Sequence, residues 1–470
     1  MKPLEFCENR CIFVSELCEY KRSNMLKRKV VKYLTDWKKR QGHKPLVIDG
    51  ARQVGKTRSV IEFGKNNYKN LVVINFILAP KFKTIFDDGF EVDSIIKNIS
   101  LLEPEWHFEP GATLIFFDEL QDCPNCATSL KSFHIDGRYD VICSGSLMGM
   151  HYKEIDSNAV GYKEDYTMYS MDFEEYLWAF GYGEDVIESL LDKMVAVTPL
   201  SATEMSVFAS KYRDYMIVGG MPEIVNGFVE SGNFSGVLPA QRQLLLDYEQ
   251  DITKYAAPLD KSKILSVYRH IPVFLAKDNK KFQITKISRN ARSRDFVGVV
   301  DWLRDAGIVN ICYCLDRPEL PLAGNYKYDN YKMYYHDNGL LIASLDDEAQ
   351  DDLRVNRNFN TYKGAVFENA IGEALVKQGY KLYFYRNEKS TVEMDFFVRT
   401  AANLVPVEVK ASNGASPSMR RLVDNDTYPD VKYGVKFCVS NIGFDGKIYT
   451  FPHFLAFLLR RFLERTAALS

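Results

Sequence analysis

The chain has 470 residues, a formal net charge of −2, and 46% hydrophobic against 26% charged residues. This composition excludes an intrinsically disordered chain, and the near-neutral charge excludes a wholly basic nucleic-acid coat protein, although a local basic surface remains compatible with it. Nine scattered cysteines do not form a secreted disulfide scaffold, so they favour a cytoplasmic location. The sequence has no uninterrupted apolar run of about 18 residues, so we expect no membrane span.

The first segment has no clear place in a fold. Residues 1–24 show little periodicity, and we expect them to form an extension outside the fold, with Met25 as a second candidate start. A structured N-terminal arm is the alternative. Apolar residues then recur at helical spacing from Arg28 to Trp37, which predicts a helix before the first strand.

Four short apolar runs, separated by helical stretches, predict the strands of a parallel sheet. The runs are rich in β-branched and aromatic residues and do not alternate with polar residues. Strands buried on both faces, as in a parallel sheet covered by helices, have this composition. We therefore predict one α/β domain over residues 25–178. The predicted strands are Leu46–Asp49, Leu71–Phe76, Thr113–Asp118 and Tyr139–Cys143.

A glycine-rich phosphate loop (P-loop) follows the first predicted strand. It matches G-x-x-x-x-G-K-[ST] in full, and a helix is predicted to follow it from Arg58. Glycines let the backbone approach phosphate oxygens, and the loop amides with the helix N-terminus supply positive potential. We expect Lys56 to neutralise the β- and γ-phosphates of ATP and Thr57 to bind Mg²⁺. The residues expected to bind the nucleotide are Gly50, Ala51, Arg52, Gln53, Val54, Gly55, Lys56, Thr57 and Arg58.

Two acids at the end of the third predicted strand fit a nucleotide-hydrolysing site. We expect Asp118 to hold Mg²⁺ and Glu119 to act as the general base on the attacking water. Successive side chains of a strand point to opposite faces, so Glu119 must act from the strand tip, where the chain turns. The next strand ends with two serines, whose hydroxyls can sense the γ-phosphate. Ser144 is the first choice and Ser146 the second; a structural turn serine is the alternative.

The remaining sequence divides into three blocks. Residues 179–258 have helical patterns, including Asp185–Met194 and Ala240–Tyr255. Residues 259–348 contain helices and then extended segments. Residues 349–470 open with a helix, and strands are predicted at Lys381–Tyr385, Glu393–Val398 and Val405–Lys410.

A basic stretch in the second of these blocks fits a DNA-binding helix-turn-helix. Seven Lys or Arg residues and a single acid lie between Lys277 and Arg294. In a winged helix the second helix enters the major groove of DNA, and basic side chains neutralise phosphates. The alternative is a solvated face on a module that contacts protein, because the fold alone does not establish DNA binding. The two predicted helices are Phe282–Ser288 and Arg294–Leu303, and the predicted wing strands are Ile308–Cys312 and Lys332–Tyr335.

Three carboxylates and a lysine in the last block fit metal-dependent cleavage of phosphodiesters. Glu368 lies on a predicted helix and Asp395 on a strand. Glu408 and Lys410 share one face of the next strand, since residues i and i+2 point the same way. Asp395 and Glu408 can hold a second Mg²⁺ or Mn²⁺ through oxygen ligands, and Lys410 can activate a water. This order resembles the PD-(D/E)XK nuclease superfamily; a nuclease fold kept for docking, with structural acids, is the alternative.

Six short runs carry a wider resemblance: residues 50–57, 117–121, 143–146, 171–177, 218–222 and 337–340. Over residues 25 to 460 the chain resembles prokaryotic AAA-like ATPases whose C-terminal half is the domain of unknown function DUF4143. The resemblance implies a P-loop NTPase sheet of the additional-strand, catalytic-Glu type with a helical lid (179–258). A winged helix (259–348) and a nuclease-like α/β domain (349–470) are implied to follow. The sequence marks no arginine finger, since neither Arg213 nor Arg242 in the expected lid stands out.

Two functional hypotheses follow. The first is a Mg²⁺-dependent ATPase whose nucleotide state controls a C-terminal module that binds DNA and, in one version, cleaves it. The second is a nucleotide-switched ATPase whose C-terminal half holds a protein partner and whose nuclease-like domain is non-catalytic. Both allow an oligomer.

Overall fold

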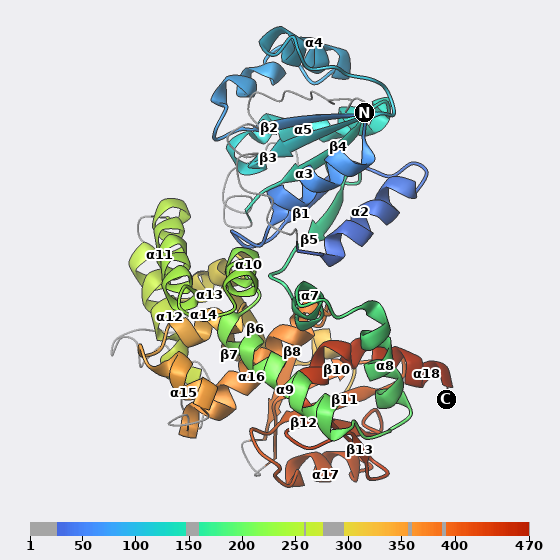
Figure 1. Cartoon of the computed structure of the whole chain (residues 1–470), viewed down its shortest axis with the longest axis vertical. Helices are drawn as coiled ribbons and strands as arrows, with labels where there is room; N and C mark the ends of the chain where they lie inside the picture. The colour runs from blue at the N-terminus through green and yellow to red at the C-terminus, as the bar shows by residue number, and fades with distance from the viewer. Residues whose placement is uncertain are drawn as a thin grey trace, which may run out of the picture.

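The structure is a computed structural model. It describes residues 26–146, 159–257, 260–275, 296–355, 360–387 and 392–469. The expected extension over residues 1–24 and the basic stretch from Lys277 to Arg294 lie outside these described residues. Figure 1 shows an upper lobe, which the first strands and helices form, and a lower lobe, which the chain forms from α7 (Phe173–Ala179) onward.

The upper lobe is built on a parallel sheet of β1 (Leu46–Asp49), β2 (Asn70–Asn75), β3 (Thr113–Asp118), β4 (Asp140–Ser144) and β5 (Glu164–Thr167). The strand order is β2-β3-β4-β1-β5, and each neighbouring pair is parallel. β4 therefore lies between the strand that leads into the phosphate loop and the strand that ends at Asp118. The four predicted strands are confirmed to within one residue at each end; β5 was not predicted.

Both faces of this sheet are covered by helices, namely α2 (Lys29–Lys39), α3 (Lys56–Asn67), α4 (Val92–Leu102), α5 (Pro124–Asp136) and the 3₁₀ helices η1 (Pro80–Phe86) and η2 (Leu120–Asp122). Leu114 and Phe116 of β3 share one core with residues of α2 and α3. Ile115 and Phe117 share a second core with residues of α4 and α5. Alternate residues thus enter two different cores, which explains why the predicted strands are apolar throughout.

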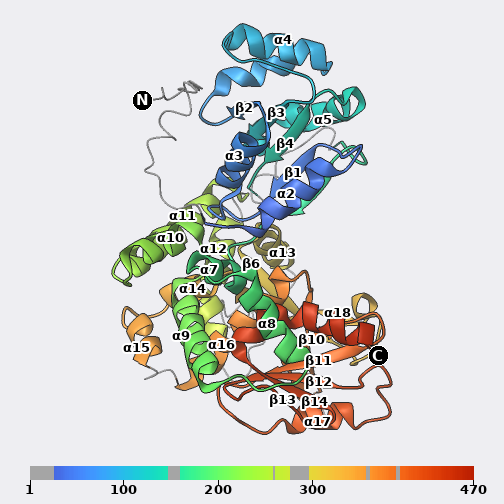
Figure 2. The same ribbon diagram turned by 45° about the vertical axis from the view of Figure 1, so that its right-hand side comes forward.

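A helical segment opens the lower lobe after α7, with α8 (Glu184–Val195), α9 (Ala202–Val218), α10 (Pro222–Ser231), α11 (Val237–Tyr255) and α12 (Lys261–Leu275). In Figure 1 and in the turned view of Figure 2, α10 and α11 lie at the junction of the two lobes. The expected helices within residues 179–258 are confirmed, and α8 and α11 extend the two that were predicted.

Two glycines break the helices where three runs of the family resemblance meet. Gly219 has a φ of 75°, and a Cβ there would lie 2.2 Å from Asp337 Oδ1. A Cβ on Gly220 would lie 2.0 Å from the carbonyl oxygen of Met171. Asp337 is fully buried, and it accepts hydrogen bonds from the Gly220 amide (2.7 Å) and the Ser170 hydroxyl (2.9 Å). Only glycine at positions 219 and 220 allows three segments to approach so closely: residues 170–171, the turn between α9 and α10, and Asp337 of the lower lobe.

The rest of the lower lobe is α13 (Val297–Asp305), β6 (Val309–Leu315), η5 (Leu322–Gly324), β7 (Tyr326–Tyr335), α14 (Asn338–Ala343), α15 (Ala349–Val355), α16 (Asn360–Lys377), β8 (Leu382–Arg386), β9 (Glu393–Met394), β10 (Phe396–Arg399), β11 (Leu404–Val409), α17 (Pro417–Val423), β12 (Gly434–Cys438), β13 (Gly443–Phe444), β14 (Ile448–Pro452), η6 (His453–Leu458) and α18 (Leu459–Leu469). These strands form two mixed sheets, in the orders β7-β6-β8-β9 and β10-β11-β12-β14-β13.

The first of these sheets contains strands from both sides of position 349, where the nuclease-like block was expected to begin: β6 and β7 precede it, and β8 and β9 follow it. β6 and β7 pair antiparallel, as wing strands do, but β6 also pairs in parallel with β8. The strand predicted over Glu393–Val398 is wrong in one respect, because it divides at Asp395 into β9 and β10, which pair in different sheets. At the division, Asp395 accepts a hydrogen bond from the Val409 amide, so its carboxylate caps the neighbouring strand β11.

Among the described helices, none combines the length and the apolarity that crossing a membrane requires.

Candidate functional site

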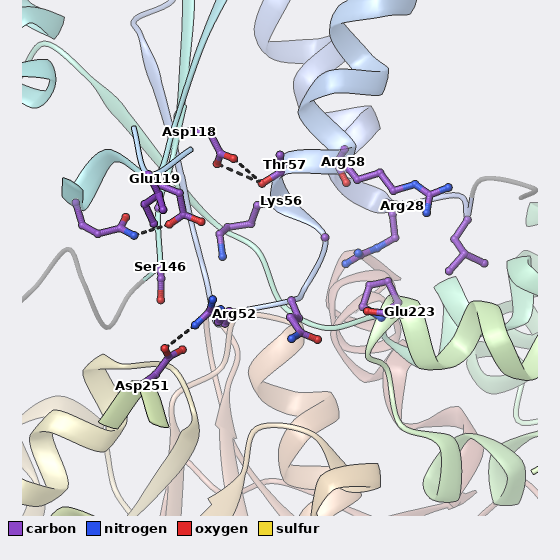
Figure 3. A pocket seen from close by; sticks show the side chains of 18 of the residues that line it. Arg28, Arg52, Lys56, Thr57, Arg58, Asp118, Glu119, Ser146, Glu223 and Asp251 are labelled. Atoms are coloured by element: carbon purple, nitrogen blue, oxygen red, sulfur yellow. Dashed lines mark hydrogen bonds and ion pairs between the residues drawn. The ribbon is translucent and has the colours of Figure 1, made fainter. Parts of the chain in front are cut away.

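A cavity of about 920 Å³ lies where the carboxyl ends of the parallel strands approach α10 and α11 (Figure 3). Ligands of open α/β sheets commonly bind at this edge. The lining residues come from the phosphate loop, the tips of β3 and β4, and the two helices. The polar residues that the following paragraphs use are Arg28, Arg52, Lys56, Thr57, Asp118, Glu119, Ser146, Glu223, Asn226 and Asp251.

The two glycines of the phosphate loop have backbone conformations that other residues rarely adopt. Gly50 has a φ of 148°, and a Cβ there would lie 2.2 Å from the Met168 carbonyl oxygen. Gly55 has a φ of 95°, and a Cβ there would lie 3.2 Å from Arg28 Nη1. The loop therefore needs glycine at both positions, for its own shape and for the close contacts behind it.

Lys56 points into the loop and is held by the loop itself. Its Nζ donates hydrogen bonds to the carbonyl oxygens of Gly50 (3.0 Å) and Ala51 (2.8 Å). Burial lowers the pKa of Lys56 to about 8, against the opposing effect of the Glu119 and Asp118 carboxylates. An anionic ligand beside this amine would favour its charged form, so the loop is prepared for a polyanion.

Asp118 is the centre of a hydrogen-bonded cluster at the end of β3. Its carboxylate accepts hydrogen bonds from Thr57 Oγ1 (3.2 and 3.1 Å), Asn75 Nδ2 (2.9 Å) and the Ser144 hydroxyl. The residue is only 3% exposed. Thr57 and Asp118 thus present a hydroxyl and a carboxylate side by side, and these are the hard oxygen ligands that Mg²⁺ prefers.

Glu119 lies at the strand tip in the left-handed region, with φ 60° and ψ 49°. This conformation is strained for a residue other than glycine. It turns the chain so that the carboxylates of Asp118 and Glu119 both line the cavity, as the sequence required. Burial and, second, the Asp118 charge raise the pKa of Glu119, while Gln121 donates a hydrogen bond to its carboxylate. A raised pKa makes a carboxylate a better general base.

The two serines that follow β4 have different surroundings. Ser144 is fully buried, and its hydroxyl donates to Asp118. Ser146 lines the cavity, and within the described part of the chain its hydroxyl has no hydrogen-bond partner. Ser146, the second choice, is therefore the serine that lines the cavity, whereas Ser144 contacts the Asp118 carboxylate.

The sequence analysis missed Arg28, which supports the loop from behind. Its buried guanidinium donates to the Val54 carbonyl (2.7 Å), the Tyr169 carbonyl (2.8 Å) and the Glu175 carboxylate (3.0 Å). It also lines the cavity. In the sequence it is one of many basic residues before the first strand, so no local signal separates it from a surface arginine.

The helices α10 and α11 contribute acids and an amide that were also missed. Glu223 and Asn226 follow Pro222, which begins α10 at the cavity, so the proline was a usable signal for this helix start. Asp251 lies within α11 among other charged residues, and nothing in its sequence neighbourhood marks it.

Comparison with protein families agrees with this geometry. Residues 42–177 match the family described as AAA domain, and residues 363–453 match a domain of unknown function, DUF4143. The chain joins an AAA-type P-loop ATPase domain to a DUF4143 domain. Residues 209–351, between them, match another domain of unknown function, DUF8612, and this match spans position 258, where we expected the lid to end. Among the curated proteins, no match was found.

Solved structures with similar folds include a Walker-type ATPase of Pyrococcus abyssi (12% identity, 69% of this chain and 97% of that chain, TM-score 0.43). Others are the ORC1 protein of Aeropyrum pernix in complex with DNA (10% identity, 74% and 96%, TM-score 0.29) and AMPPCP-bound DnaA from Aquifex aeolicus (13% identity, 60% and 87%, TM-score 0.26). At these low scores the likenesses carry no argument about the function of this chain.

Two of the three carboxylates predicted in the DUF4143 domain, Glu368 and Asp395, act on an internal cation. Lys332 of β7 is 2% exposed, and its Nζ lies 3.0 Å from Glu368 Oε1 and 3.6 Å from Glu393 Oε1. Burial lowers the pKa of Lys332, but the charges of Glu368, Asp395 and Glu393 outweigh it, so the net shift is upward. Tyr334 also donates to Glu368 (2.5 Å). The lysine ammonium thus contacts Glu368 of the predicted nuclease set, and the charge of Asp395, an expected metal ligand, also acts on it.

The other members of the predicted nuclease set are close together. Lys410 Nζ lies 2.7 Å from Glu408 Oε1, and the Asp395 charge acts on both Lys332 and Lys410. Glu408 is 3% exposed, and its second oxygen has no hydrogen-bond partner in the described ranges. However, no three Asp, Glu, His or Cys side chains of the described residues are grouped so that they could hold a metal ion. The second Mg²⁺ or Mn²⁺ expected at Asp395 and Glu408 therefore has no support from this arrangement.

Proposed function

We propose that this protein binds and hydrolyses ATP at the cavity between the parallel sheet and α10–α11. The observation that carries the proposal is the arrangement at one cavity edge of Lys56, the Thr57–Asp118 pair and Glu119. This arrangement supplies a cation, a metal-binding pair and a base of raised pKa at the same place. It supports phosphoryl transfer to water.

Each residue has a distinct role in this proposal. Lys56 leaves its two carbonyl partners and binds the β- and γ-phosphates. Bound Mg²⁺ would neutralise phosphate charge, and Thr57 and Asp118 would hold it. Glu119 orients a water and accepts its proton, and Ser146 donates a hydrogen bond to the γ-phosphate. The loop amides bind the remaining phosphate oxygens.

The test compares ATP turnover of the wild type with that of Lys56→Ala. We expect Lys56→Ala to lose ATP binding and turnover, because the loop then lacks its phosphate cation. Lys65→Ala, at the other end of the same helix α3, is the matched control and keeps the wild-type rate. Normal turnover by Lys56→Ala would falsify the assignment of the site.

We further propose that the nucleotide state controls the lower lobe, and that this lobe binds a partner without cutting nucleic acid. The proposal that the lower lobe does not cut nucleic acid rests on Lys332, because its ammonium supplies the positive charge that the buried carboxylate of Glu368 and the nearby Glu393 would otherwise take from a metal ion. Plasmid DNA incubated with the protein and Mn²⁺ should therefore stay intact. Cleavage that disappears in Asp395→Ala would instead establish the nuclease version and identify Asp395 as its metal ligand.

The class of partner is decided by a binding experiment with duplex DNA at two salt concentrations. An ATP-dependent affinity that falls steeply with salt supports the DNA-binding winged helix over residues 259–348, since basic side chains that neutralise phosphates release counterions. The protein-partner version predicts no such affinity and an ATP-dependent co-purification of a protein. Lys56→Ala is the control for ATP dependence in both arms.

A further inference from the structure

The phosphate loop carries a second cation besides Lys56. Arg52 lines the same cavity as Lys56 and Glu119, and its side chain is 53% exposed. Arg52 and Glu119 are close enough for each charge to act on the other. In Figure 3, Arg52 lies between the base side of the cavity, where Glu119 and Ser146 are, and α11. Its guanidinium therefore has access to the phosphate that Lys56 and Glu119 serve.

Hydrogen bonds and an ion pair join the loop around Arg52 to α11. Arg52 Nη1 lies 2.5 Å from Asp251 Oδ1, and Tyr248 donates a hydrogen bond to the Arg52 carbonyl (3.0 Å). Gln53, which has a φ of 63°, donates to Asp247 (3.2 Å). Three contacts, made by Asp247, Tyr248 and Asp251 within about one helical turn, thus join the phosphate-loop apex to one helix of the DUF8612 segment.

In the ion pair between Arg52 and Asp251, the arginine side chain is exposed and the aspartate side chain is buried. Asp251 is 4% exposed, so its carboxylate depends on a cation for its charge. The polyphosphate of ATP is a stronger anion, and a guanidinium binds phosphate oxygens in a bidentate manner. ATP and Asp251 therefore compete for Arg52. Lys254 also lines the cavity, and the Asp251 charge acts on it.

We propose that Arg52 is the arginine that this chain itself supplies to the transferred phosphoryl group, and that Asp251 holds it until ATP binds. The inference rests on the proposed ATP hydrolysis. In that reaction a water oxygen bonds to the γ-phosphorus and Glu119 takes the water proton. The bond from the γ-phosphorus to the bridging oxygen breaks, and its electron pair leaves with ADP. Arg52 binds the γ-phosphate oxygens as their charge changes, which is a catalytic role.

When Arg52 leaves Asp251 on ATP binding, the position of α11 can change, and this change can reach the lower lobe. Tyr248, which contacts the Arg52 carbonyl, also lies 3.3 Å from His336 Nε2 in the buried interior. His336 precedes Asp337, the buried acid that joins the two glycines between α9 and α10 to the lower lobe. A shift of α11 after Arg52 leaves is thereby transmitted to the junction of the lobes. Asp251 is a positioning residue, because it acts through Arg52.

The test is a double-mutant cycle with Arg52→Ala, Asp251→Asn and the double variant, in which kcat and the Kd for ATP are measured. We expect Arg52→Ala to lower kcat by about 100-fold or more and to change the Kd much less, as for a cation that acts in the transition state. Arg52→Lys should have an intermediate kcat, since it keeps the charge without the planar fork. Asp251→Asn should tighten ATP binding by about 10-fold, because the competitor of ATP is removed.

The decisive comparison is the effect of Asp251→Asn in the two backgrounds. It should tighten ATP binding when Arg52 is present and have no effect in Arg52→Ala. Glu249→Gln, which removes the α11 pair with Arg269 away from the cavity, is the matched control and should match the wild type. A weaker affinity in both backgrounds would show that Asp251 only supports the helix, and this would overturn the competition.

Failure of the inference and failure of the proposed function give different results. If wild type and Glu249→Gln hydrolyse ATP, and Arg52→Ala stays within about threefold of their kcat, the role of Arg52 is overturned while ATP hydrolysis stands. If the wild type binds ATP without hydrolysing it, the proposed function fails and the catalytic role of Arg52 fails with it. The affinity cycle still tests the competition in that case. A melting-temperature measurement identifies any variant that does not fold.

Discussion

The phosphate-loop site and the DUF4143 carboxylate cluster began as the same kind of prediction, and the structure separates them. In the first, Lys56, Glu119 and Ser146 line an open cavity of about 920 Å³. In the second, Lys332 and Glu368 are 2% and 3% exposed and bind each other. Charged residues at a fixed spacing therefore mark a ligand site only where the fold leaves them facing open space.

The energetic reason is the cost of a buried charge. A carboxylate inside a protein needs a cation or hydrogen-bond donors, and it can obtain them from a ligand or from the chain. Glu368 obtains them from Lys332 and Tyr334. Asp118 obtains hydrogen bonds from the chain too, but it remains beside the cavity and beside Thr57, so a metal can still reach it.

At the open site, Glu119→Gln should bind ATP and lose hydrolysis. The amide cannot accept the water proton, so we expect kcat to fall about 1,000-fold or more. Single-turnover measurements with saturating ATP and Mg²⁺ check this, and a binding titration checks that affinity is retained. Glu105→Gln, an exposed acid upstream of β3, is the control. A Glu119→Gln protein with near-normal kcat would assign the base to another residue.

At the buried Lys332–Glu368 pair, Lys332→Met should lower the free energy of unfolding of the protein. Removing the ammonium leaves Glu368 buried without its cation, which costs about 4 kcal/mol of unfolding free energy. Denaturant unfolding measures the loss. Lys327→Met, on the same strand with a 40% exposed side chain, should change stability by less than about 1 kcal/mol.

The combined variant Lys332→Met/Glu368→Leu is the second arm of this experiment. Because both charges are removed together, much of the lost stability should return. If Lys332→Met is as stable as the wild type and gains Mn²⁺ binding, the acids form a metal site, and the Lys332 ammonium occupies the position of the metal ion.

The lower lobe should also lose stability in acid through His453. This histidine stacks on Phe367 at 4.1 Å, its Nε2 lies 2.9 Å from the Lys410 carbonyl, and burial lowers its pKa to about 4. Its folded pKa is below the ordinary value, so the unfolded chain binds the proton more readily. The stability is complete above about pH 6.5 and falls by up to about 3 kcal/mol as the pH drops to 4.

Chemical denaturation at a series of pH values measures this loss, with His453→Gln as the comparison. The variant cannot take up the proton, so its stability should fall less steeply between pH 6.5 and pH 4. Equal slopes for the two proteins would remove His453 from the explanation.

The smallest expected effect separates the two serines of the open site. Ser146→Ala should lower kcat by about 10-fold, since it removes one hydrogen bond to the γ-phosphate. Ser144→Ala should instead raise the Mg²⁺ concentration needed for half-maximal rate, because Ser144 donates to Asp118. ATP turnover measured against Mg²⁺ concentration distinguishes the two patterns, and the reverse pattern would restore Ser144 as the sensor.

Much of the upper lobe was predictable because its signals are local. Strands buried on both faces are apolar throughout, and the phosphate loop needs its glycines for backbone shape, so both features can be read from adjacent residues. The lower lobe was predicted less well. Asp395 divides a predicted strand because its carboxylate caps a strand 14 residues further on. The pairing of β6 with β8 also joins segments about 70 residues apart, across the expected boundary.

The phosphate loop, the Asp118–Glu119 strand end and the parallel sheet can be read from the sequence alone, since backbone geometry and burial pattern require those residue types at those spacings. Which polar side chains line the cavity, and which are paired inside the protein, follows from the folded structure and not from the sequence pattern. The fold placed Lys332 among the C-terminal acids, turned Ser146 and not Ser144 toward the cavity, and set Asp251 against Arg52. The physical reason is that a charge is stabilised by whatever group lies within a few ångströms of it, and those groups come from distant parts of the chain.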